Sequence, residues 1–199
     1  RGISCSDFLT RIAQNVTLRQ ITVGFQSQVY KDVYTLLHKF DVELILIGFE
    51  SDEFASAVIT RSYLLQLANS HKFLNVSRLG RVATPEDLLA LYRVIESGKA
   101  KMRCFMTGVV VEVWQPFLAL LGITMRAGYR IHSTNKEIQV FGCNEPNGDC
   151  VIYIFDKNME LSLFAKGEGH RLGMNLHGNE DSLKAAKRAM AGCRPISVV

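Results

Sequence analysis

A cysteine near the start of the chain and a histidine near its end could together perform nucleophilic chemistry. Cys5 lies in the sequence Ser4-Cys5-Ser6-Asp7, where Ser4 and Asp7 resemble a capping box. We therefore expect Cys5 in the first turn of a helix whose apolar face starts at Phe8. The positive end of a helix dipole favours the thiolate, which is the nucleophilic form. Cys5 is thus a candidate nucleophile, and the alternative is a small buried side chain at a helix start.

His170 is the candidate base for such a cysteine. It ends the glycine-rich turn Lys166-Gly167-Glu168-Gly169-His170, between two segments with strand character. A histidine beside a cysteine can take up and return the proton during attack on a carbonyl. The alternative is that His170 is only a polar turn residue. Whether it meets Cys5 decides between these interpretations.

A metal site is a second chemistry to consider. Cys143, Cys150, His170 and His177 are residue types that bind zinc. Their spacing lacks the short Cys-x2-Cys knuckle, and both cysteines flank a Pro-Asn-Gly turn. We therefore expect no metal and no other cofactor.

The first half of the chain indicates helices around one extended segment. After the helix near Cys5, helical patterns cover residues 28–40 and begin again at Ser51. Residues 42–49 form a short β-branched run that predicts a strand. Thr84-Pro85-Glu86-Asp87 is a strong helix start, and Ser97-Gly98 ends that helix. We expect residues 75–83 to be a loop and residues 99–108 a connection.

The second half indicates one helix, a meander of strands and a closing helix. Pro116 lies within the apolar run of residues 109–121, where proline restricts a helix. Either the helix starts near Trp114, with Pro116 in its first turn, or residues 109–113 are extended and the helix is short. Short strand patterns follow at residues 129–132, 137–141, 150–155, 160–165 and 171–176, and an amphipathic helix at residues 181–191. The sequence thus predicts one α+β domain over residues 1–199, with N-terminal helices packed on a C-terminal, mostly antiparallel sheet. The expected core contains Trp114, Phe117, Leu120, Leu121, Ile152, Ile154, Leu161 and Leu163.

Composition and cysteine spacing indicate which kinds of partner and which cellular location to expect. The chain of 199 residues is 48% hydrophobic and carries a net charge of +4, and its basic residues are scattered rather than clustered, which argues against nucleic acid as a partner. No apolar stretch approaches the length of about 18 residues that a membrane span needs, so we expect no membrane partner. Five cysteines at irregular spacing fit a reducing, cytoplasmic location. The first residue is arginine, which indicates a fragment or a processed product.

The order of elements resembles the ovarian-tumour (OTU) class of deubiquitinases, nearest the otubain and OTULIN-like branch. The resemblance rests on the helix start Thr84-Pro85-Glu86-Asp87-Leu88-Leu89, the helix end at residues 118–125, the segments 138–141 and 161–165, and Gly169-His170. It implies a papain-like OTU-type fold and a cysteine isopeptidase that hydrolyses ubiquitin or ubiquitin-like linkages. Cys5 would be the nucleophile and His170 the general base, and Asn175 and Asp156 are candidates for the third, orienting residue.

The chain departs from the family pattern at both ends of this site. The family's nucleophile motif is Asp-Gly-Asn-Cys, whereas Gly2 stands in the place of the acid here. Leu172 stands where the family has the hydrogen-bond acceptor that orients the histidine. A second alignment, which places Asp7 at the nucleophile and Met159 near the base, predicts no activity at all. The alternatives are therefore a catalytically inactive OTU-like module that binds a protein partner or builds an assembly, and a structural product of a processed polyprotein.

Overall fold

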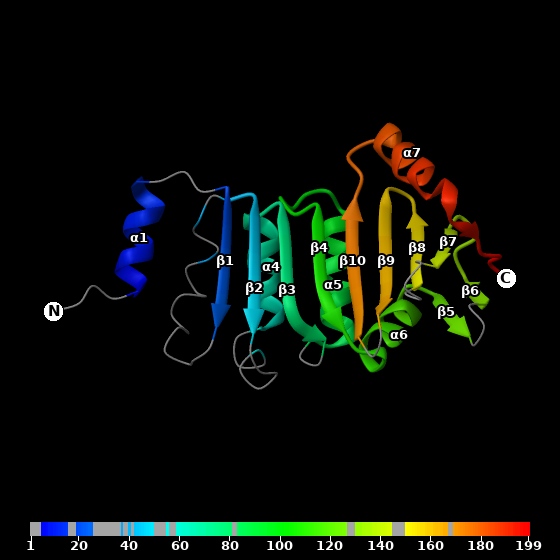
Figure 1. The fold of residues 1–199 in the computed structure, drawn as a ribbon, viewed down its shortest axis with the longest axis horizontal. Coiled ribbons are helices and arrows are strands. Elements are labelled where there is room, and N and C mark those ends of the chain that lie inside the picture. The colour runs from blue at the N-terminus through cyan, green and yellow to red at the C-terminus, as the bar shows by residue number, and fades with distance from the viewer. Residues whose placement is uncertain are drawn as a thin grey trace.

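The computed structural model describes residues 5–15, 19–25, 37, 40, 42–49, 55, 59–80, 83–126, 130–144, 150–166 and 169–199. Within these residues nine strands form one sheet in the order β1-β2-β3-β4-β10-β9-β8-β7-β11. Figure 1 shows this sheet running across the molecule from β1, on the N-terminal side, to β7 near the C-terminus. A separate two-stranded sheet is formed by β5 and β6.

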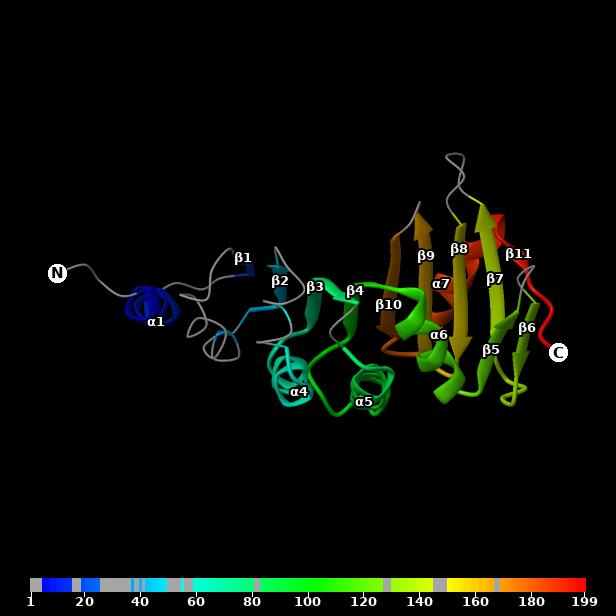
Figure 2. The ribbon, with the colours of Figure 1, turned by 90° about the horizontal axis from the view of Figure 1, so that it is seen from below.

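Four parallel strands form the first half of the large sheet. They are β1 (Gln20–Phe25), β2 (Leu44–Phe49), β3 (Phe73–Gly80) and β4 (Cys104–Val109). The helices α4 (Arg61–Ser70) and α5 (Pro85–Glu96) connect β2 to β3 and β3 to β4. Both helices lie on the same face of the parallel strands (Figure 2).

Side-chain caps fix where these two helices begin. The Thr60 hydroxyl accepts a hydrogen bond from the backbone N–H of Tyr63 at the start of α4. At α5, Thr84 and Asp87 form a reciprocal capping box, with Pro85 at the first helical position. The start of α5 was predicted from these same residues, and that prediction is confirmed.

Antiparallel strands form the second half of the sheet. They are β10 (Gly169–Leu176), β9 (Met159–Lys166), β8 (Cys150–Asp156), β7 (Gln139–Asn144) and the short β11 (Arg194–Pro195). The two-stranded sheet consists of β5 (Ile123–Arg126) and β6 (Arg130–Ser133). The chain closes with α7 (Glu180–Ala189) and the 3-10 turn η2 (Met190–Gly192).

The helix α6 (Val111–Leu120) follows β4 and contains Pro116 in its interior. Neither predicted alternative is correct in full, because residue 109 still belongs to β4 while the helix already starts at Val111. Proline lacks the N–H that would bond to the carbonyl of Glu112 four residues earlier, so the ladder is interrupted there. Gly122, with φ of 75°, then allows the turn from α6 into β5.

The predicted class, α+β, is confirmed, but the first half is richer in strands than expected. The meander at residues 139–176 and the strand at residues 44–49 are strands as predicted. Residues 75–83 and 99–108 were predicted as connections, yet they contain most of β3 and most of β4. The sheet is therefore mixed, because parallel strands from the first half join the antiparallel meander. The described residues leave out most of the helix predicted at residues 28–40. They also leave out the start of the helix predicted at Ser51.

The core prediction is correct for six of its eight residues. Trp114, Phe117, Ile152, Ile154, Leu161 and Leu163 are buried. Leu120 is wrong: it is 44% exposed, since α6 turns Trp114, Phe117 and Leu118 inward. Leu121 is half-buried against the core.

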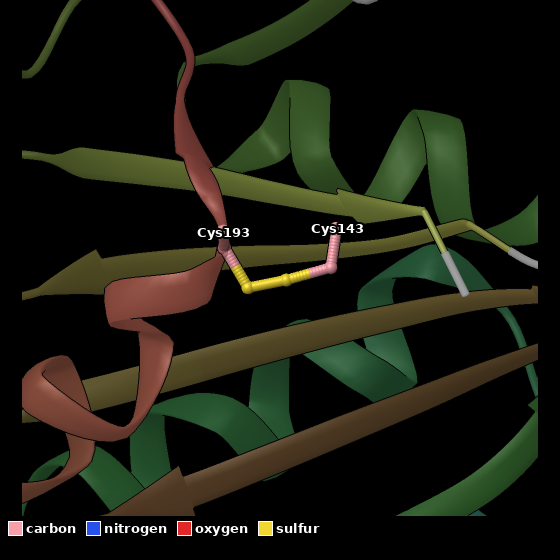
Figure 3. The surroundings of a disulfide bond; sticks show 2 residues. All are labelled: Cys143 and Cys193. Carbon is pink, nitrogen blue, oxygen red and sulfur yellow. A yellow bond between two sulfur atoms is a disulfide. The ribbon is translucent and has the colours of Figure 1, made fainter. Parts of the chain in front are cut away.

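The last residues of the chain form a strap that joins the two sheets. A disulfide links Cys193, just before β11, to Cys143 on β7 (Figure 3). Farther on, the Ile196 N–H donates to the Val140 carbonyl at 2.9 Å, and the Val199 N–H donates to the Ile131 carbonyl of β6 at 3.0 Å. The irregular cysteine spacing predicts a reducing location, where disulfides are rare, and the pairing of Cys143 with Cys193 departs from that expectation. Cys104 is a free cysteine.

No helix among the described residues is both long enough and apolar enough to cross a membrane.

Replacing Ile154 with alanine should lower the free energy of unfolding by about 2–5 kcal/mol, because Ile154 is fully buried. The matched control is Leu120→Ala, which should change it by no more than about 0.5 kcal/mol, because that side chain is largely exposed. Urea unfolding followed by circular dichroism measures both. Equal destabilisation by the two variants would contradict the assigned packing of α6 and β8.

Replacing Cys193 with serine should lower the free energy of unfolding by about 2–4 kcal/mol, because the disulfide to Cys143 constrains the unfolded chain over a separation of 50 residues. Adding a dithiol reductant to the parent protein should reproduce this loss and leave the variant unchanged. A parent whose urea midpoint does not respond to the reductant would show that the strap is not held by this bond.

Candidate functional site

The candidate nucleophile and the candidate base lie on widely separated elements. Cys5 is the first residue of α1 (Cys5–Asn15), so the predicted helix start is correct. In Figures 1 and 2, α1 lies beyond β1, at the end of the sheet. His170 is on β10, which β2, β3 and β4 separate from β1. At about 4.8 Å per strand, β1 and β10 are about 19 Å apart, so the structure does not bring Cys5 and His170 together.

The described side-chain contact of His170 is with an aromatic ring. Its ring lies 5.9 Å from the ring of Trp114 on α6, measured between centroids. Asn175, the candidate orienting residue, is five positions farther along the same strand, at a distance of about 17 Å. Five positions is an odd number, so the two side chains point to opposite faces of the sheet. Asn175 therefore cannot hold the imidazole of His170.

Two of the four residues considered for zinc have other partners. Cys143 forms the disulfide with Cys193. His177 contacts Glu160, with 3.0 Å between Nε2 and Oε2. Within the described part of the chain, no group of three or more histidine, cysteine or acidic side chains is arranged to hold a metal ion.

The parallel half of the sheet has two unlike faces. On the helix side, alternate residues of each strand are buried: Ile45, Ile47, Leu74, Val76, Phe105, Thr107 and Val109. The residues between them point to the other face, where no described helix covers β2, β3 or β4 (Figure 2). Parallel sheets usually have helices on both faces, whereas the described helices cover only one face of this half.

The strand register arranges the second face into two rows of side chains. We call the part of these rows on β1 to β4 the open face. One row is Gln20, Leu44, Phe73 and Cys104, and the next is Thr22, Leu46, Asn75 and Met106. The leucines, Phe73, Cys104 and Met106 are half-buried, while Gln20, Thr22 and Asn75 are exposed. The open face is therefore mainly apolar, with Gln20 and Thr22 at its β1 edge and Asn75 between Leu46 and Met106.

A polar cluster marks the boundary of the open face toward β10 and β9. Asn175 pairs with Cys104 across β4 and β10, and with Glu160 across β10 and β9, so all three side chains lie on this face. Asn175 Nδ2 donates to Glu160 Oε1 at 3.3 Å, and His177 contacts the other oxygen. Glu160 is buried, with both of its oxygens partnered, which satisfies its carboxylate.

Beyond this boundary, α7 approaches the same side of the sheet. Lys187 of α7 lies over Phe155 of β8, with 5.6 Å from Nζ to the ring centroid. Phe155 pairs with Glu160 in the register, so both belong to the face that continues from the open face. The antiparallel half thus has a helix on this side, whereas among the described elements the parallel half has none.

Cys104 is the only thiol among the residues that make up the two rows of the open face, and its surroundings suppress its reactivity. Burial and, to a smaller extent, the negative charge of Glu160 raise the pKa of the Cys104 thiol to about 11. A reactive cysteine needs the opposite shift, toward the thiolate. The open face is accordingly suited to binding rather than to nucleophilic chemistry.

Neither protein-family models nor curated proteins yield a match to this chain.

Sequence reasoning missed the open face, although one signal pointed to it. The segment Leu44-Ile45-Leu46-Ile47 is apolar on both sides of its strand, as expected of a strand that is covered on both faces. Met106 and Phe73 repeat this pattern on the neighbouring strands. Those two strands were predicted as loop, so their shared face could not be seen.

The raised pKa predicts slow alkylation of Cys104. At pH 8 its thiolate population should be about 100-fold below that of an unperturbed thiol, because each pKa unit is a factor of ten. The rate with iodoacetamide, read at the Cys104 peptide by mass spectrometry, should keep rising up to about pH 11. Glu160→Gln should move this profile to lower pH, because it removes one cause of the shift. Labelling that levels off near pH 9 would contradict the assignment.

Proposed function

We propose that this chain is a non-catalytic protein-binding module whose partner docks on the open face of the parallel strands. The observation that carries the proposal is the pair of registered rows with Leu44, Leu46, Phe73 and Met106, half-buried on the face that the described helices leave uncovered. Clustered apolar side chains with a polar rim are typical of interaction sites.

The geometry supports binding better than hydrolysis. A cysteine nucleophile needs its base within hydrogen-bond reach, about 2.6–3.2 Å. Cys5 and His170 are held at the two ends of four parallel strands, and Asn175 is engaged with Glu160. The OTU-like isopeptidase implied by the resemblance would need α1, which carries Cys5, to move past β1, β2, β3 and β4 to reach His170 on β10. The binding or assembly alternative needs no such movement.

The partner of the open face is expected to be a protein that offers apolar side chains. The face carries leucine, phenylalanine and methionine, and methionine adapts its shape readily to a partner. Its exposed polar members, Gln20, Thr22 and Asn75, carry no charge, and Gln20 Nε2 donates to Thr22 Oγ1 at 3.2 Å. A surface of this kind selects shape and apolar contact rather than a charged ligand. Ubiquitin, the partner implied by the resemblance, is one protein to test directly.

A photoreactive amino acid at position 46 should form a discrete covalent adduct with the partner, because Leu46 lies in the centre of the open face. The same group at position 115 is the matched control, since Gln115 is exposed on α6. Met106→Asp should abolish the adduct at position 46, because Met106 lies in the same row as Leu46, with Asn75 between them. Adducts are read by mass spectrometry after irradiation of the purified protein with and without ubiquitin.

Two results would overturn the proposal. One is equal labelling from positions 46 and 115, or none from either. The other is labelling of Cys5 by a ubiquitin C-terminal electrophile, together with cleavage of ubiquitin chains that Cys5→Ala abolishes.

A further inference from the structure

The described part of the chain contains a second apolar surface, on α1. Phe8 is 54% exposed, and among the exposed large hydrophobic residues that the structure describes it is the aromatic one. Ile12, one helical turn later, is half-buried, so the two form an apolar stripe at the i, i+4 spacing. Asp7, Arg11, Gln14 and Asn15 are exposed around this stripe. The helix is amphipathic, and both views show it apart from the described sheet (Figures 1 and 2).

We propose that the occupant of the open face is α1 of a second copy of this chain, so that two copies exchange their first helices. This inference rests on the proposed function, because it names the partner of the same face. It joins two observations: an apolar sheet face without a described helix, and an amphipathic helix that exposes a phenylalanine.

The dimensions of the two surfaces match. An α-helix rises 1.5 Å per residue, so the 11 residues of α1 span about 17 Å. A strand rises about 3.3 Å per residue, so the six residues of β2 span about 20 Å. Helices pack on parallel sheets roughly along the strands, at a separation of about 10 Å. α1 therefore has the length to lie along β2 and β3, with Phe8 and Ile12 against Leu46 and Phe73.

The position of α1 favours a second copy over its own sheet. β1 is the edge strand, and α1 lies on the outer side of that edge, away from β2 (Figure 1). To cover its own open face, the helix would have to cross β1. The open face of a second copy can bind α1 in its present position. The α1 helix of that second copy can bind the open face of the first, which gives a closed, two-fold exchange.

The test is complementation between two variants, followed by sedimentation velocity. Phe8→Asp places a charge in the apolar stripe of α1, and Met106→Asp places a charge in the open face. Each variant alone should dissociate at concentrations where the parent is dimeric, with the dissociation constant raised about tenfold or more. Mixed together, they should form a heterodimer, because the intact α1 of the Met106→Asp chain can dock on the intact face of the Phe8→Asp chain.

Two controls separate loss of the docking contact from a general effect of the added charge or from misfolding. Gln14→Asp adds the same charge about 240° around the helix from Phe8, and it should leave the dimer unchanged. Circular dichroism establishes that each variant is folded, and a misfolded Met106→Asp is replaced by Leu46→Asp. A monomeric parent overturns the inference, as does a dimer that is insensitive to Phe8→Asp or a mixture that stays monomeric. If position 46 cross-links to a different protein irrespective of Phe8, this inference fails while the proposed function stands.

Discussion

The antiparallel pairing of β4 with β10 is the contact on which the rest of the molecule depends. It joins residues 104–109 to residues 170–175, which are far apart in the chain, and thereby makes one sheet from a parallel half and an antiparallel half. It also aligns Cys104, Asn175 and Glu160 in a single row. The same pairing holds His170 near Trp114, on the helix side of the sheet. Without it, the open face would lack the polar boundary that Asn175 and Glu160 form beside Cys104.

The asymmetry between the two faces of the parallel half follows from how the helices are distributed. α4 and α5 cross on one side and bury Ile45, Val76 and Phe105. The strands nevertheless carry leucine, phenylalanine and methionine on the other side as well. Burial of these side chains by a partner would be worth about 25 cal/mol for each square ångström of apolar area removed from water. This free energy would stabilise a complex formed on the open face.

Local signals in the sequence predicted the elements that local physics determines. The cap at Thr84 and the β-branched and aromatic run at residues 150–155 specify a helix and a strand through neighbouring residues alone. β4 was missed because its six residues include a glycine and lack a clear turn before them. Its identity therefore depends on pairing with β3 and β10. The burial of Leu120 was wrong because Pro116 obscured where α6 begins, and the phase of the helix sets its inner face.

The separation of Cys5 from His170 could not be predicted for a related reason. Cys5 and His170 each have a local setting that suits catalysis, but whether they meet is decided by the order of strands, which no local pattern encodes. The open face has the same origin: it is visible only once the register places Leu46, Asn75 and Met106 side by side.

Oxidation of methionines tests the central claim, which is that the open face is accessible in a single copy of the chain. Met106 lies on that face and is half-buried, whereas Met102 and Met174 are fully buried. The protein is exposed to hydroxyl radicals at high dilution, and sulfoxide at each methionine is measured by peptide mass spectrometry. The account predicts that Met106 is oxidised much faster than Met102 and Met174. Equal protection of all three would contradict it.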